Sequence, residues 1–134
     1  MPFVAHDDVA ELGTICDPVL LCVRDDPDVE EILHSGGLLR SMVAGGIVVN
    51  HGTGDPAASV RFGEAAARHG LTYLDAPVSA ALPGEEPARV TTIVGGDHEA
   101  VARCRPVFDA YSVAVHHVGT TGAGQLAKDR KSVV

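Results

Sequence analysis

Short apolar runs, separated by segments that carry helix-starting signals, constrain the fold of this chain more than any other feature. The run Val19-Leu-Leu-Cys-Val23 is apolar throughout, which is typical of a strand buried on both faces. The runs predicted to be strands are residues 19–23, 46–50, 71–75, 89–94 and 113–118. Strands that alternate with helices in this way predict an α/β domain with a mostly parallel sheet.

The segments between these runs contain residues that start and end helices. Asp55 precedes Pro56, so Asp55 is predicted to cap a helix whose first residue is the proline. That helix is predicted to end at Gly70, where the chain must turn. A later helix is predicted to begin after Asp97 and to continue to about residue 108. Helices therefore follow strands along most of the chain.

Composition and charge narrow the class of protein. A length of 134 residues predicts one domain. The net charge of −8 argues against a surface for nucleic acid or an anionic membrane. The apolar runs are too short to span a bilayer, and the first residues do not resemble a signal peptide. The three cysteines are odd in number and irregularly spaced, so we expect reduced thiols and a cytoplasmic location.

A glycine-rich segment near the end of the chain, Gly119-Thr-Thr-Gly-Ala-Gly-Gln-Leu-Ala-Lys128, carries a lysine. It follows the last predicted strand and opens a predicted helix. Backbone N–H groups at a helix start favour anionic or electron-rich groups, and a lysine beside them can serve in proton transfer. A solvated lysine on an ordinary helix explains the same residues, so both interpretations stay open.

Two short stretches match the glycine fingerprint of dinucleotide-binding loops, at residues 52–57 and 122–127. Pro56 lies inside the first match and removes a backbone N–H that a pyrophosphate needs. The second match leaves no room for a following strand. We therefore favour capped turns, although an independent nucleotide-binding module would require one of these loops to hold pyrophosphate.

Polar residues also follow the third predicted strand, in the segment Asp75-Ala-Pro-Val-Ser79. An acid and a hydroxyl at the carboxyl end of a strand suit substrate binding in an open α/β sheet, but on this segment alone we favour a structural turn. The histidines are scattered, and the adjacent His116 and His117 would point to opposite faces of a strand. We predict no metal site.

Together these segments resemble the β-hydroxyacid dehydrogenase family, of which 3-hydroxyisobutyrate dehydrogenase is typical; the NAD(P)-binding domain of 6-phosphogluconate dehydrogenase is related. The resemblance covers about residues 9–128 and rests on four motifs in the family's order. The motifs are Val19-Leu-Leu-Cys-Val-Arg-Asp-Asp26, Val48-Val-Asn-His-Gly-Thr53, Asp75-Ala-Pro-Val-Ser79 and Gly122-Ala-Gly-Gln-Leu-Ala-Lys128. The resemblance implies hydride transfer between NAD or NADP and a small 3-hydroxy acid.

The resemblance also implies roles for individual residues. Lys128 corresponds to the family's catalytic lysine, which moves the proton of the reacting oxygen. Ser79, Ala80 and Ala81 correspond to the residues that hold the substrate carboxylate, although the family has a glycine pair where the two alanines stand. The residues implied to line the cofactor are Val23, Arg24 and Thr53.

The chain departs from the family pattern in ways that affect the prediction. Lys131 and Ser132 stand where the family has an asparagine pair after its lysine. We expect the family's first βαβ unit and its C-terminal helical domain, which usually mediates dimerisation, to be missing. The prediction is an incomplete Rossmann-type NAD(P)-binding domain at residues 1–128 and a divergent tail at 129–134, with little activity alone. A non-catalytic remnant or a nucleotide-binding module is the alternative.

Overall fold

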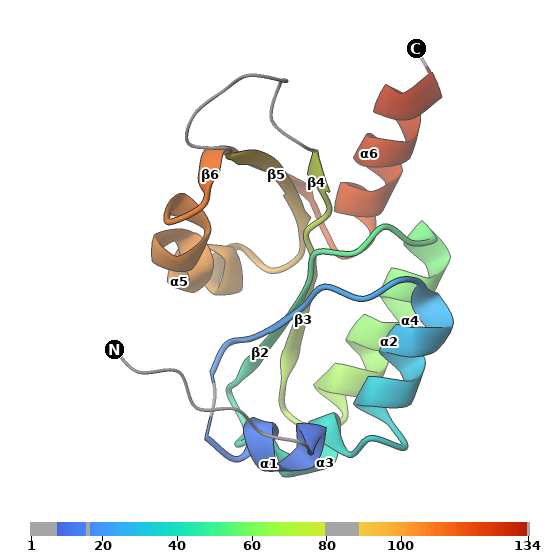
Figure 1. Cartoon of the computed structure of the whole chain (residues 1–134), viewed down its shortest axis with the longest axis vertical. Coiled ribbons are helices and arrows are strands. Elements are labelled where there is room, and N and C mark those ends of the chain that lie inside the picture. The colour runs from blue at the N-terminus through green and yellow to red at the C-terminus, as the bar shows by residue number, and fades with distance from the viewer. Residues whose placement is uncertain (1–7, 16, 80–88, 134) are drawn as a thin grey trace.

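A mixed sheet with helices on both faces forms the body of the molecule (Figure 1). The computed structural model describes residues 8–15, 17–79 and 89–133. The strands are β1 Val19–Leu21, β2 Ile47–Asn50, β3 Thr72–Asp75, β4 Val78–Ser79, β5 Val90–Gly95 and β6 Ser112–Gly119. The helices are α1 Val9–Gly13, α2 Asp26–Leu33, α3 Leu38–Ser41, α4 Pro56–Ala67, α5 His98–Asp109 and α6 Ala123–Val133. The predicted α/β alternation is confirmed.

The sheet is parallel over most of its width. Strand β2 lies between β1 and β3 and runs parallel to both, and β6 runs parallel to β5. Strand β5 reverses direction relative to β3 and β4, which the prediction of strands alone did not show. Parallel neighbours need a crossover of about a dozen residues or more, usually a helix. Among the described residues no helix lies between β3 and β5, and an antiparallel pair does not need such a crossover.

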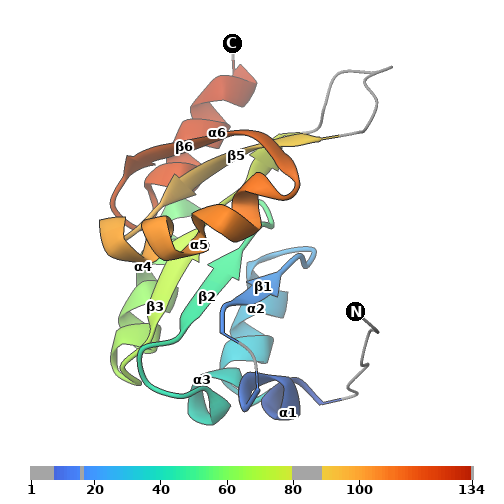
Figure 2. The same cartoon turned by 90° about the vertical axis from the view of Figure 1, so that its left-hand side faces the viewer.

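Helices cover both faces of the sheet, as Figures 1 and 2 show, and an apolar layer lies on each face. On one face, Val48 of β2 and Tyr73 of β3 pack with residues of α2, α3 and α4. On the other face, Ile47, Val49 and Leu74 pack with α5. Successive residues of a strand point to opposite faces, so the unbroken apolar runs are explained by burial on both sides.

The predicted starts of α4 and α5 are confirmed, whereas α4 ends at Ala67, three residues before the predicted Gly70. The Asp55 side chain accepts a hydrogen bond from the Ala57 N–H, and the Asp97 side chain accepts one from the Ala100 N–H. Ala58, Phe62 and Ala66 are buried together on one face of α4, as their spacing predicts. Within the described ranges no helix is long and apolar enough to cross a membrane.

The last helix includes most of the residues predicted as a divergent tail. Helix α6 runs from Ala123 to Val133. The backbone of most of the predicted divergent tail, residues 129–133, is therefore helical. Lys128 lies in the second turn of α6, near the glycine-rich turn that precedes the helix.

Candidate functional site

The candidate site lies where α6 meets the loops that follow β2 and β3. The Lys128 ammonium Nζ donates hydrogen bonds to Thr53 Oγ1 at 3.0 Å and to the carbonyl oxygen of Val78 at 2.7 Å. Thr53 follows β2, and Val78 begins β4 after the turn that follows β3. Open α/β sheets bind ligands at this carboxyl edge of their strands. The structure thus brings together three of the four motifs.

The start of α6 is held by a buried carboxylate. Asp75 is completely buried, and its two oxygens accept hydrogen bonds from the N–H groups of Gly122 at 2.8 Å and Gln125 at 2.9 Å. Burial raises the pKa of Asp75, and the hydrogen bonds from these N–H groups act in the opposite direction. These contacts support the interpretation of Asp75 as a structural residue rather than a substrate ligand.

Two glycines allow α6 to approach the sheet this closely. A Cβ atom on Gly124 would lie 2.6 Å from the Asp75 carbonyl oxygen, and one on Gly95 would lie 2.7 Å from the Gly124 nitrogen. Both distances are shorter than any ordinary contact, so a side chain at either position would push the helix away. The glycines place Lys128 by bringing its helix against the strands.

Gln125 is a site residue that the sequence prediction missed. Its side chain is 1% exposed, and its carboxamide contacts the loop that carries Thr53. The Gly54 N–H donates to Gln125 Oε1 at 3.0 Å, and Gln125 Nε2 donates to the Gly52 carbonyl at 2.8 Å. A polar side chain directly after two closely spaced glycines, at the start of a helix expected to pack on the sheet, was the available signal, because a buried polar group needs hydrogen-bond partners.

The other end of this loop is fixed by Asn50. Its carboxamide oxygen accepts from the Gly52 N–H at 2.9 Å, and its nitrogen donates to the Tyr73 hydroxyl at 3.0 Å. Asn50 is 2% exposed, so it needs both an acceptor and a donor in the interior. The Asn50 amide therefore provides an acceptor for the Gly52 N–H and a donor to the Tyr73 hydroxyl.

The residues implied to line the cofactor differ in their surroundings. The Val23 carbonyl oxygen lies so close to Gly52 that a Cβ there would be 2.8 Å away, which places Val23 beside the Thr53 loop. Arg24 has an exposed side chain, and its guanidinium pairs with Asp28 at 3.4 Å. Ser79 is partly buried at the end of β4. Ala80 and Ala81 lie outside the described residues.

Neither glycine match forms a pyrophosphate cradle. In the first, the N–H groups of Gly52, Gly54, Asp55 and Ala57 already donate to side chains of this chain. In the second, the carboxylate of Asp75 occupies the helix start where an anion would bind. Both loops are therefore capped turns, as favoured above, and the independent nucleotide-binding module loses its basis.

A histidine beside the site links β2 to α5. His51 Nδ1 donates to the Ala76 carbonyl at 2.7 Å, so the other ring nitrogen, Nε2, accepts from the Tyr111 hydroxyl at 2.6 Å. The His51 ring also packs edge-on against Phe108. Burial lowers the pKa of His51, although its hydrogen bond to Ala76 opposes the change. Burial raises the pKa of Tyr111 to about 12.

Acid is expected to destabilise the protein through His51. Because the folded-state pKa of His51 lies below its ordinary value of 6.5, the neutral ring contributes its full stability above about pH 6.5. That contribution is lost as the pH falls through 6.5 toward the lower folded-state pKa. Urea unfolding between about pH 8 and pH 5 measures the loss, which His51→Gln should reduce. The exposed His69→Gln is the control, and parallel profiles for wild type and His51→Gln would contradict the expectation.

The other described histidines lie apart from the candidate site or are held by neighbouring backbone groups. His117 Nε2 contacts the carbonyl oxygens of Gly96 and Gly119, and its ring stacks on His98 with centroids 5.9 Å apart. His116 is exposed on the same strand. In the part of the chain that the structure describes, no three His, Cys, Asp or Glu side chains gather to hold a metal ion.

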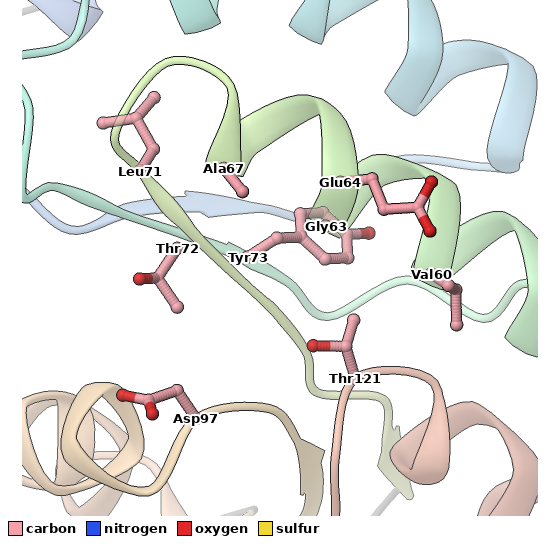
Figure 3. Close-up of a pocket in the computed structure, with 9 residues that line it drawn as sticks. All are labelled: Val60, Gly63, Glu64, Ala67, Leu71, Thr72, Tyr73, Asp97 and Thr121. Atoms are coloured by element: carbon pink, nitrogen blue, oxygen red, sulfur yellow. The ribbon is translucent and has the colours of Figure 1, made fainter.

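A hollow of about 330 Å³ lies between α4, β3 and the turn before α6 (Figure 3). Tyr73 extends from β3 toward α4, and Thr121 and Asp97 border the hollow below it. Its lining is mostly apolar and includes neither Lys128 nor Thr53. The hollow is therefore separate from the candidate site.

Comparisons with a family model, related sequences and a solved structure all point to the same protein family. The family model described as the NAD binding domain of 6-phosphogluconate dehydrogenase matches residues 2–119. The NAD-dependent L-serine dehydrogenase of Pseudomonas aeruginosa is 40% identical over 96 residues, covering 72% of this chain and 32% of the relative. The 2-hydroxy-3-oxopropionate reductase of Escherichia coli is 30% identical over 132 residues, covering 98% of this chain and 45% of the relative.

A solved structure shows the same fold. The 3-hydroxyisobutyrate dehydrogenase of Mycobacterium tuberculosis, described with L-serine, superposes with a TM-score of 0.86 and 26% identity. The match covers 94% of this chain and 43% of that protein. The chain thus spans less than half the length of each of these relatives. On the family model, the related sequences and the shared fold, this chain belongs to the β-hydroxyacid dehydrogenase family and matches its NAD-binding domain.

Proposed function

We propose that this chain is the NAD(P)-binding part of an oxidoreductase that transfers hydride between a nicotinamide cofactor and a small 3-hydroxy acid. The observation that carries the proposal is the contact of Lys128 Nζ with Thr53 Oγ1 and the Val78 carbonyl. It joins the implied proton-transfer lysine to the implied cofactor-lining threonine. Ser79, the implied substrate residue, directly follows Val78.

The described residues fit the nicotinamide end of the cofactor. Val23, Arg24 and Thr53 follow the carboxyl ends of the adjacent parallel strands β1 and β2, where cofactors bind in open sheets. A side chain on Gly52 would strike the Val23 carbonyl, so the two loops lie in contact here. Within residues 8–15, 17–79 and 89–133, the two glycine matches leave no cradle for the pyrophosphate.

The proposed chemistry assigns a proton to Lys128 and positions to its neighbours. The nicotinamide supplies or accepts the hydride when it is bound. Lys128 exchanges the hydroxyl proton at Nζ, so the oxygen loses its proton as the carbon loses its hydride. Thr53 Oγ1 and the Val78 carbonyl hold Nζ in place for that exchange. Ser79, Ala80 and Ala81 are proposed to hold the carboxylate.

A chimeric enzyme tests this function. The segment of the Escherichia coli reductase that matches this chain would be replaced by residues 1–134. We expect NADH- or NADPH-dependent reduction of small 3-oxo acids, and the reverse reaction with 3-hydroxy acids, measured by absorbance of the reduced cofactor. A chimera that folds cooperatively but turns over no acid of the series with either cofactor would contradict the proposal.

A non-catalytic remnant remains the second candidate. Lys131 and Ser132 in place of the asparagine pair favour it. An active chimera would argue against a remnant, because natural selection does not maintain a functional site in a non-catalytic protein. We further propose a reducing cytoplasmic location, no binding of nucleic acid, and a homo-oligomer for a full-length enzyme that contains this domain.

A further inference from the structure

The carboxamide of Gln125 brackets one residue of the candidate site. Its oxygen accepts from the Gly54 N–H, and its nitrogen donates to the Gly52 carbonyl. Thr53 is the residue between these two glycines. Both ends of the buried amide are therefore used to fix the backbone on each side of the Thr53 side chain.

Gln125 and Lys128 lie on the same side of α6, because residues three apart in a helix are neighbours. One face of this helix thus contacts the loop twice, through backbone groups beside Thr53 and through its hydroxyl. A lysine side chain has four flexible bonds and is readily displaced by solvent. A persistent Lys128–Thr53 contact therefore requires that the loop itself does not move.

We propose that Gln125 is a positioning residue that locks the Gly52–Gly54 loop to α6 and so keeps Thr53 within hydrogen-bond distance of Lys128. Its importance for turnover rests on the proposed function, whereas the lock itself concerns this chain alone. Asn50 and Asp26 hold the two ends of the loop, through the N–H groups of Gly52 and Asp55. Gln125 ties the backbone in the middle of the loop to the helix of Lys128.

The test is a double-mutant cycle read by NMR on the chain without cofactor or substrate. The reporter is the change in the Thr53 amide shift caused by Lys128→Met. We expect this change to be reduced about threefold or more in Gln125→Leu and to persist in Leu126→Ala, a variant of the exposed neighbouring residue. An undiminished change in Gln125→Leu would overturn the proposal, because the loss of a merely stabilising glutamine would lower the free energy of unfolding without altering the Thr53 response.

A milder variant keeps the test decisive where Gln125→Leu does not fold. Gln125→Glu retains an acceptor for the Gly54 N–H but sets a carboxylate against the Gly52 carbonyl. We expect the Thr53 response to fall here as well, together with faster hydrogen exchange at Gly54. A Thr53 response equal to wild type in Gln125→Glu would also overturn the lock. These measurements do not depend on turnover. An inactive chimera would therefore contradict the proposed function but not the proposed role of Gln125.

Discussion

Replacing Lys128 with methionine is expected to lower the turnover of the chimeric dehydrogenase by about 10²–10⁴-fold, the usual contribution of a positioned acid–base group. Methionine keeps the length of the side chain but removes the group that exchanges the proton. The side chain also loses its bonds to Thr53 and to the Val78 carbonyl. Cofactor affinity should change by less than about threefold, because most cofactor binding energy comes from other parts of the cofactor. Steady-state kinetics and cofactor titration separate the two effects.

Two further variants identify what the lysine contributes. Lys128→Arg keeps the positive charge and can donate hydrogen bonds, but guanidinium does not release its proton. We therefore expect Lys128→Arg to be nearly as slow as Lys128→Met. Lys131→Met removes the same charge three residues later in the sequence and should leave turnover within about twofold. Turnover near wild type in Lys128→Met would exclude the lysine as the proton-transfer residue.

The repeated pattern of strands and helix caps was readable from the sequence because its causes are local. Asp55 with Pro56 and the spacing of Ala58, Phe62 and Ala66 specify one helix and its buried face without reference to the rest of the chain. Burial of a strand on both faces likewise leaves an unbroken apolar run. The direction of β5 depends instead on its connection, and β4 has only the two residues Val78–Ser79, too few to show a period.

The site was only partly readable because its polar contacts join residues far apart in the sequence. The family motifs singled out Lys128 and Thr53, and the structure places the two side chains in contact. The roles of Asp75 and Gln125 depend on which backbone groups remain unpaired when α6 docks on the sheet. The spacing of residues in the sequence does not show which backbone groups will need a hydrogen-bond partner. The sequence therefore left a ligand-binding role for Asp75 open beside the favoured structural turn, and the structure shows that both carboxylate oxygens accept hydrogen bonds from the start of α6.

Substitution of Asp75 by asparagine is expected to lower the free energy of unfolding by about 2–3 kcal/mol, the cost of leaving a buried N–H group without its charged acceptor. The asparagine has nearly the same shape, so no cavity forms. Its NH₂ group must face either the Gly122 N–H or the Gln125 N–H, both of which are donors. Urea unfolding followed by circular dichroism measures the change, against a stability of about 5–15 kcal/mol for a typical domain.

Asp97→Asn provides the matched control, because it makes the same chemical change at another helix start. Asp97 is exposed and caps α5 through the Ala100 N–H at 3.1 Å, and asparagine caps helices about as well as aspartate, so we expect a change below about 0.5 kcal/mol. If Asp75→Asn were equally mild, the carboxylate would not be needed to hold α6, and a ligand-binding role for Asp75 would return. If it is costly, the Thr53 amide shift should also move, since α6 carries both Gln125 and Lys128 to that loop. Loss of stability together with a shift at Thr53 would show that one buried carboxylate supports both the fold and the placement of the lysine.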